Sequence, residues 1–189
     1  GLKRRNFMKE KVLGDYELTP DYLPAEGDLK FTVKPIDLIT HWRRCGIIAN
    51  FVADYHETGE TDIDKNIVST VFNELIENAS KYSTKRDSEI NIEVKRYNRI
   101  LKMQVSNTSN QSYFESLINR LTLIINSENL DELFYDEMQK KASGDKQSEI
   151  GLLIMFKDYQ IKLGAKLVEK GEDLFDITVQ AYYFIGNHE

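Results

Sequence analysis

The chain has 189 residues, of which 41% are hydrophobic and 11% aromatic, enough to build the core of one domain and too many for a disordered chain. Its formal net charge of −6 argues against nucleic acid or an anionic membrane as the main partner, because both need a positive protein surface. No apolar run approaches the ~20 residues that cross a bilayer. The first 30 residues carry charges where a signal peptide needs an apolar core, so we expect a cytoplasmic protein.

The N-terminal residues 1–27 mix charges with Pro20, Pro24 and Gly27, which predicts an irregular lead-in. A single domain is expected to follow over residues 28–189. It opens with residues 28–34, which alternate between apolar and polar side chains like a short strand.

The period of the apolar residues then changes to that of a helix over residues 35–57, which begins at Pro35 and ends before Gly59. Cys45 lies inside this apolar pattern, so we expect a buried, unreactive thiol rather than a nucleophile. The three histidines have no metal-ligand spacing with each other or with the cysteine, so no structural zinc is expected.

A second helix is predicted from Thr61 to about Tyr82, where Thr61 and Asp64 resemble a capping box. Residues 89–96 and 100–105 alternate and predict an antiparallel hairpin with one buried face. The polar residues 107–111 predict a turn that ends its second strand.

Residues 112–143 predict two charged amphipathic helices, and a loop over 143–147 separates them from a helix over about 149–162, capped by Ser148 and stopped by Gly164. Residues 166–169 and 174–184 complete the chain as strands. This order of elements predicts an α+β fold: a two-layer sandwich of a mixed, mostly antiparallel sheet with helices on one face.

Part of the second predicted helix sets polar groups along the border of its apolar face. Glu74, Asn78 and Lys81 are separated by four and then three residues, so they lie almost one above another. At the edge of a cleft, the three could serve a metal-bound polyphosphate: Glu74 as base for a hydroxyl or water, Asn78 as magnesium ligand and Lys81 as a charge for phosphate. The same pattern is common on solvated helix faces, and the periodicity alone does not decide between the two interpretations.

The segment from Asn73 to Lys81 reads NELIENASK and resembles the N-box of the GHKL superfamily, the ATPase and kinase domain shared by gyrase, histidine kinases and anti-sigma-factor serine kinases. The order of helix, hairpin, variable lid over about 112–147, helix and hairpin is also similar to that of the family. The resemblance covers roughly residues 30–185 and implies the family's sandwich fold, with ATP and magnesium as cofactors.

Residue by residue, the resemblance implies Glu74 as the general base, Asn78 as the magnesium ligand and Lys81 as a phosphate-side residue. Together with the N-box, residues 42–51 (WRRCGIIANF) are similar to the SiaB-type kinases and their cyanobacterial relatives. Those resemble anti-sigma regulators, which implies a small STAS-like, anti-anti-sigma partner that is phosphorylated on serine or threonine.

Two glycine motifs of the family are degenerate here. Where the family has Asp-x-Gly-x-Gly, residues 107–111 read Asn-Thr-Ser-Asn-Gln, so the adenine-reading carboxylate becomes the amide of Asn107. An amide still accepts through its oxygen, whereas side chains in place of glycine crowd a bound base. Only Gly151 remains of the later glycine motif, and Glu149 would bring a carboxylate near the triphosphate.

Two functions of different classes therefore remain open. The first is a magnesium- and ATP-dependent serine/threonine protein kinase in which Glu74 activates a hydroxyl of the partner for in-line transfer, and the retained polar stripe favours it. The second is a non-catalytic binding module of the same fold that sequesters its partner, which the missing glycines favour.

A histidine kinase fits less well, because no histidine lies in a segment resembling a phosphoacceptor helix. The exposed helical face and the end at Tyr182 to Phe184 could support a homodimer.

Overall fold

The sheet is open, has six strands among the described residues and is antiparallel at every neighbouring pair. The computed structural model describes residues 10–19, 23–59, 63–84, 88–144 and 150–186. The strand order is β1-β5-β6-β4-β3-β2. The strands are β1 (Glu10–Gly14), β2 (Glu26–Val33), β3 (Ile90–Tyr97), β4 (Ile100–Ser109), β5 (Lys162–Gly171) and β6 (Leu174–Phe184). The α+β class is confirmed, and the sheet lacks the parallel pairs that a mixed sheet would need within these ranges.

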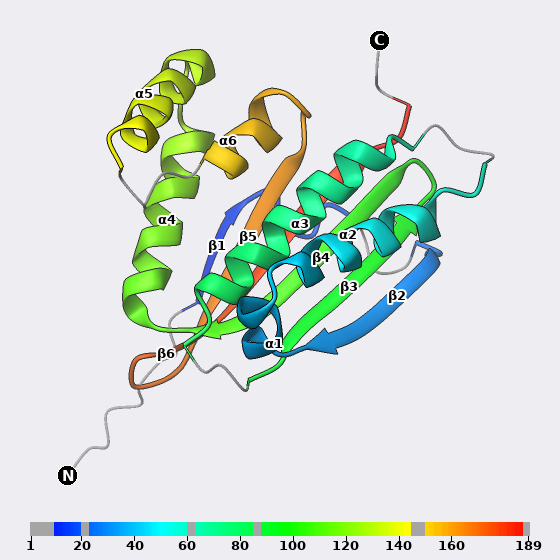
Figure 1. The fold of residues 1–189 in the computed structure, drawn as a ribbon, viewed down its shortest axis with the longest axis horizontal. Coiled ribbons are helices and arrows are strands. Elements are labelled where there is room, and N and C mark those ends of the chain that lie inside the picture. Colours follow the sequence, from blue (N-terminus) through cyan, green and yellow to red (C-terminus); the bar gives the residue numbers. More distant parts are fainter. Residues whose placement is uncertain (1–9, 20–22, 60–62, 85–87, 145–149, 187–189) are drawn as a thin grey trace.

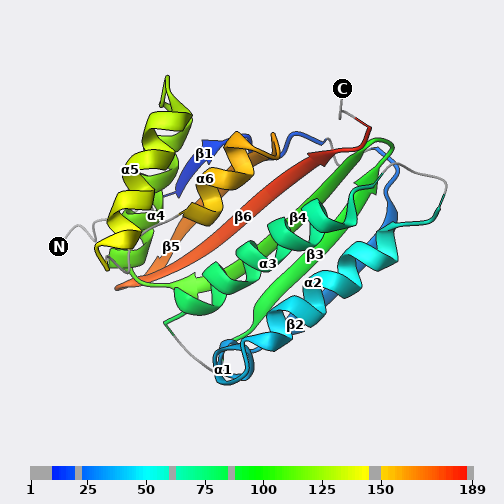
Figure 2. The same cartoon turned by 45° about the horizontal axis from the view of Figure 1, so that its top comes forward.

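The helices lie mainly on one face of this sheet (Figure 1). Those in the described ranges are α1 (Pro35–Thr40), α2 (Arg43–His56), α3 (Lys65–Lys81), α4 (Gln111–Ile125), α5 (Leu130–Ala142) and α6 (Ile150–Lys157). α2 and α3 run side by side over the strands near the β2 edge, whereas α4 and α5 lie at the β1 end (Figures 1 and 2). None of the helices in the described part of the chain is long and apolar enough to span a membrane.

α3 follows from its sequence. The Asp64 side chain accepts hydrogen bonds from the backbone nitrogens of Asn66 and Ile67 and so caps the first turn. Its core side is formed by apolar residues at helical spacing, all buried: Val68, Val71, Phe72, Leu75, Ile76 and Ala79. The predicted start at Thr61 lies outside the described residues, and the structure assigns the cap to Asp64 itself.

The helix predicted over residues 35–57 is broken in two. His41 leaves helical geometry, with φ −139° and ψ 83°. The Thr40 hydroxyl donates to the Ile36 carbonyl oxygen at 2.7 Å, a local bond that competes with helix continuation. At the other end of α2, the His56 ring nitrogens contact the carbonyl oxygens of Val52 (2.9 Å) and Gly27 (2.8 Å), which fastens α2 to β2.

Three sequence predictions are wrong because strand pairing overrides local signals. The predicted turn over 107–111 begins inside β4, which stays paired with β6 as far as Ser109 opposite Phe175. Gly164 lies within β5 rather than at a helix end, and a Cβ there would overlap the backbone of Asp15, which crosses close by. The lead-in over 1–27 contains β1, paired with β5, and the start of β2. The predicted Ser148 cap lies outside the described residues.

On the face away from the helices, residues 15–19 cross the sheet and cover polar side chains. The Gln180 amide nitrogen donates to Glu17 (2.6 Å) and to Gln104 (2.8 Å). The Tyr182 hydroxyl donates to the Gln180 oxygen at 2.6 Å, and Lys102, only 6% exposed, reaches Glu17 at 3.2 Å. These bonds satisfy buried polar groups that would otherwise oppose folding.

Candidate functional site

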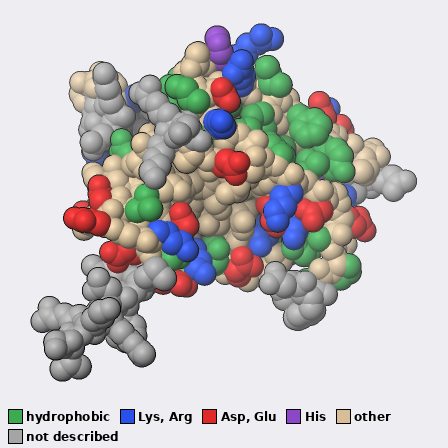
Figure 3. Space-filling view, turned by 90° about the horizontal axis from the view of Figure 1, so that it is seen from below, with side chains coloured by type: hydrophobic (Ala, Val, Ile, Leu, Met, Phe, Trp, Pro, Cys, Tyr) green, Lys and Arg blue, Asp and Glu red, His purple; other side chains and the backbone are tan. Residues whose placement is uncertain are grey.

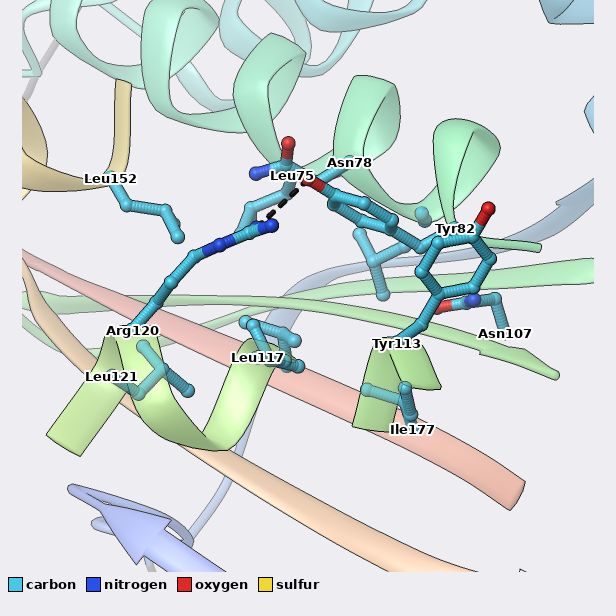
Figure 4. A pocket seen from close by; sticks show the side chains of 13 residues that line it. Leu75, Asn78, Tyr82, Asn107, Tyr113, Leu117, Arg120, Leu121, Leu152 and Ile177 are labelled. Carbon is cyan, nitrogen blue, oxygen red and sulfur yellow. Dashed lines mark hydrogen bonds between the residues drawn. The ribbon is translucent and has the colours of Figure 1, made fainter. Parts of the chain in front are cut away.

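The candidate site is a pocket between the C-terminal half of α3 and the sheet, closed on its third side by α4 (Figure 4). Its walls are mostly apolar and come from α3, β4, β6, α4 and α6. The lining residues are Leu75, Asn78, Ala79, Tyr82, Val105, Asn107, Tyr113, Leu117, Arg120, Leu121, Leu152, Ile177 and Val179. The cavity measures about 40 Å³, which is the room of about one water molecule.

Glu74 and Asn78 lie one turn apart on α3, both half-buried. The Asn78 side-chain nitrogen donates to the Glu74 carboxylate over 3.4 Å. Because the nitrogen of the amide is directed to Glu74, its oxygen is left to accept from, or coordinate, another group. The helical spacing of these two residues therefore produces the carboxylate and amide pair that the sequence predicts.

Gly151, the second residue of α6, faces Glu74. A Cβ at this position would overlap the Glu74 carboxylate, so the absence of a side chain gives that carboxylate its place. The predicted site residues Glu74 and Gly151 are thus in contact, although they come from α3 and α6.

Asn107 lies on β4 opposite Ile177 of β6 and forms the sheet side of the pocket. The residue is 8% exposed, and its side-chain nitrogen is buried with no hydrogen-bond partner in the described part of the chain. An unpaired buried amide costs about 1 to 3 kcal/mol, so its presence calls for a reason. It is the group in this pocket that most clearly lacks a partner within the fold.

Three pocket residues, Tyr82, Tyr113 and Arg120, were not predicted from the sequence. The Tyr82 and Tyr113 rings lie 5.1 Å apart, and Arg120 crosses from α4 to donate to the Tyr82 hydroxyl at 2.8 Å, as Figure 4 shows. The Arg120 guanidinium also stacks over the Tyr82 ring, 5.0 Å from its centre. The available signal was a lone arginine beside the apolar face of the helix that contains Leu117 and Leu121.

Of the predicted site residues, Asn78 and Asn107 line the pocket, whereas Glu74, Gly151 and Lys81 do not. Lys81, which the resemblance made a phosphate-side residue, is the last residue of α3 and is exposed. The cation that the structure places in the pocket is Arg120. Cys45, completely buried in α2, is poorly suited to act as a nucleophile. Burial, with a further contribution from Glu77, raises the pKa of its thiol to about 11.

Comparison of the chain with protein-family models, with curated proteins and with solved structures finds no match. The fold therefore defines only a general class: an α+β protein with an open antiparallel sheet and a small, mostly apolar pocket beneath one helix.

Proposed function

We propose that the chain is a nucleotide-binding regulatory protein of the GHKL type. The observation that carries this proposal is the meeting of Asn78 and Asn107, from α3 and β4, in one apolar pocket where the Asn107 amide nitrogen has no partner in the described residues. Buried polar groups without partners are rare in folded proteins and are typical of ligand sites. The order of α3, hairpin β3–β4, helices α4 and α5, α6 and hairpin β5–β6 supports the same proposal.

The donor set fits magnesium and a nucleotide. Magnesium prefers oxygen ligands and usually takes one or two from the protein, which Asn78 and the neighbouring Glu74 carboxylate can supply. The Asn107 amide both donates and accepts, which suits the edge of a nucleobase. A cavity of about 40 Å³ is well below the ~300 Å³ of a typical ligand pocket, so α4 has to move for a base to enter.

In this proposal the protein acts as a serine/threonine kinase toward a small STAS-like partner. Bound magnesium and ATP would supply the transferable phosphoryl group and neutralise its charge. Glu74 would accept the proton of the partner's hydroxyl as that oxygen bonds to the γ-phosphorus and the bond from this phosphorus to the departing ADP breaks, and Asn78 orients the Glu74 carboxylate. Arg120, which lines the pocket, would face the developing negative charge in place of the exposed Lys81.

A second candidate function is a binding module that sequesters the same partner without chemistry. The small volume of the cavity and the side chains at residues 107–111 favour it, because both oppose a bound base. The two functions share the fold and differ in whether Glu74 and Asn78 still act.

The test is a titration of the purified protein with ATP, with and without magnesium, by calorimetry and thermal unfolding. Binding at one hundred times the dissociation constant raises the free energy of unfolding by about 2.7 kcal/mol. Arg120→Ala should weaken binding by about tenfold, whereas Lys81→Ala should leave it unchanged. The nucleotide proposal is wrong if millimolar ATP with magnesium gives neither a heat of binding nor a rise in the unfolding temperature.

Where binding is found, phosphorylation of a partner separates the two candidates. Glu74→Gln should lose transfer, because the amide cannot take the hydroxyl proton, while ATP should still bind about tenfold more weakly, because a neutral amide oxygen is a weaker magnesium ligand than a carboxylate. Wild-type protein that binds ATP and partner but transfers no phosphate assigns it to the sequestering class.

A further inference from the structure

Two surfaces at the β2 end of the molecule are left uncovered by the fold. β2 is the last strand of the sheet, so one of its edges has no neighbouring strand in the described part of the chain. Above it, α2 exposes Ile47 (53%), Phe51 (53%) and Tyr55 (48%). Their spacing of four residues aligns them along one side of the helix. Figure 3 shows hydrophobic side chains gathered over the α2 part of the surface.

The exposed apolar side chains of α2 (Ile47, Phe51 and Tyr55) lie on the same side of the molecule as the unpaired edge of β2. Ile47 and Ile48 of α2 and Thr32 and Val33 of β2 line one groove of about 480 Å³. At the other end of α2, the Tyr55 ring comes within 3.8 Å of the position that a Cβ on Gly27 of β2 would take. We call this continuous surface, formed by β2 and the exposed side of α2, the β2–α2 face.

The charges of the β2–α2 face are divided between its two ends. β2 and α2 run in opposite directions, because the end of α2 at His56 bonds to the start of β2 at Gly27. One end is acidic, through Glu26, Asp28, Asp54 and Glu57, and the other is basic, through Lys34, Arg43 and Arg44. Lys65, Lys95 and Arg96, the last opposite Glu26 on β3, partly neutralise the acidic end, as do Asp37 and Glu89 the basic end, which leaves an excess of one charge of each sign.

We propose that a second copy of this chain docks on the β2–α2 face. A two-fold axis between Ile47 and Phe51 sets β2 antiparallel to its counterpart, brings the exposed apolar side chains of the two α2 helices into contact and places the acidic end of each copy against the basic end of the other. A face with acid at one end and base at the other is complementary to itself under such an axis, and this is what selects a second copy as the occupant. The 14 residues of α2 span about 21 Å, a length suited to a dimer interface of standard size.

The contact is tested by measuring molar mass across a range of protein concentrations, by sedimentation or by light scattering after gel filtration. The wild-type protein should reach the mass of a dimer, and Phe51→Asp should raise the dissociation constant by about tenfold or more. Leu123→Asp is the matched control, because Leu123 is equally exposed, at 53%, but lies on α4 at the opposite end of the sheet. It should leave the dimer intact.

Charge reversal tests the orientation. Arg43→Glu and Asp54→Arg should each weaken the dimer by several-fold, and the double variant should recover most of the loss, because the two-fold axis sets residue 43 near residue 54 of the other copy. Circular dichroism checks that each variant folds. A wild-type chain that stays monomeric at all concentrations overturns the proposal and leaves the face to another protein. A dimer unaffected by Phe51→Asp, or a double variant weaker than both single ones, also overturns it.

Discussion

Asn107 brings an amide into the wall of an otherwise apolar pocket. Its carbonyl and amide backbone groups belong to a strand paired with β6, so the residue cannot move away to find a partner for its side chain. The side-chain nitrogen is buried and lacks a partner within the described ranges. An apolar residue would be more stable here, so the unpaired amide is what the proposed binding role would explain.

Replacing this amide should stabilise the free protein and abolish its ligand response. In Asn107→Leu the desolvation cost disappears and the larger side chain enters the adjoining 40 Å³ cavity, so the free energy of unfolding should rise by about 1 kcal/mol. The same variant should show no stabilisation by ATP and magnesium. Urea unfolding with and without nucleotide measures both effects. A destabilised Asn107→Leu would mean that the amide has a partner in the free protein.

Gly151 permits the observed position of Glu74. In Gly151→Ala the new methyl group displaces the Glu74 carboxylate, which is the end of a flexible side chain and can rotate away. We expect the free energy of unfolding to stay within about 1 kcal/mol of the wild type, while the magnesium-dependent affinity for ATP falls by about tenfold.

Gly46 in α2 provides the control for this substitution. No atom lies within 4 Å of a Cβ at Gly46, so Gly46→Ala should stabilise the helix by about 0.5 to 1 kcal/mol and leave nucleotide affinity unchanged. Equal nucleotide affinity in Gly151→Ala and wild type would show that Glu74 does not depend on the glycine.

At the scale of elements, the sequence predicts what periodicity determines locally. α3 and the β3–β4 hairpin are found where alternation and helical spacing place them, and Glu74 and Asn78 follow from the same spacing. The wrong boundaries depend on partners far away in the chain. β1 pairs with a strand near the other end of the chain, and residues 107–109 remain extended only because β6 lies beside them.

The candidate site divides in the same way. Asn107 and Gly151 came from the family resemblance, and the structure brings them to the same region as α3. Tyr113 and Arg120 could not be predicted, because they reach the pocket through the packing of α4 against the sheet, which no local pattern encodes. Lys81 stays a prediction: helical spacing placed it on the stripe, and in the structure it ends α3 and is exposed.

Residues 15–19 cover the Tyr182 hydroxyl, and this burial makes the free energy of unfolding fall at alkaline pH. Burial raises the pKa of this hydroxyl from 10.0 to about 12, with a smaller contribution from the nearby Glu17 carboxylate. Since the neutral form is favoured in the folded protein, this stabilisation is complete below pH ~10 and is lost as the pH rises toward ~12.

In that interval Tyr182 should lower the free energy of unfolding by up to about 1.4 kcal/mol per pH unit. Tyr182→Phe should be less stable near neutral pH, because the bonds to Gln180 and to the Leu18 backbone are lost, and its deficit should shrink between pH ~10 and ~12. Urea unfolding of both proteins across this range is the measurement. Cys45, whose pKa is about 11, is common to both and cancels in the difference. A deficit that stays constant with pH would contradict the assignment to Tyr182.

At the scale of the whole molecule, the core consists of two unequal parts. The main cluster joins α2, α3 and α6 to the strands, and a small second cluster lies beneath α4: Leu121, Ala165, Leu167 and Ile177. The pocket lies at the boundary between the two clusters. Leu75 and Val105 on one of its walls belong to the main cluster. Leu121 and Ile177 on the other wall belong to the small cluster. Opening the small cluster would therefore widen the pocket without unfolding the rest.

This division predicts that the small cluster opens by itself. Leu167→Ala removes a completely buried side chain of that cluster, at a cost of about 2 to 5 kcal/mol, without touching the pocket lining. Hydrogen exchange should accelerate in α4 and β1, while α3 and β3 should lose less protection. Ile92→Ala, a substitution of similar cost in the main cluster, should accelerate exchange throughout the molecule.

If α4 opening admits the nucleotide, Leu167→Ala should also raise the association rate of ATP, because the open state is more populated. Uniform acceleration of exchange in both variants would show a single cooperative core and would remove α4 as the route of entry.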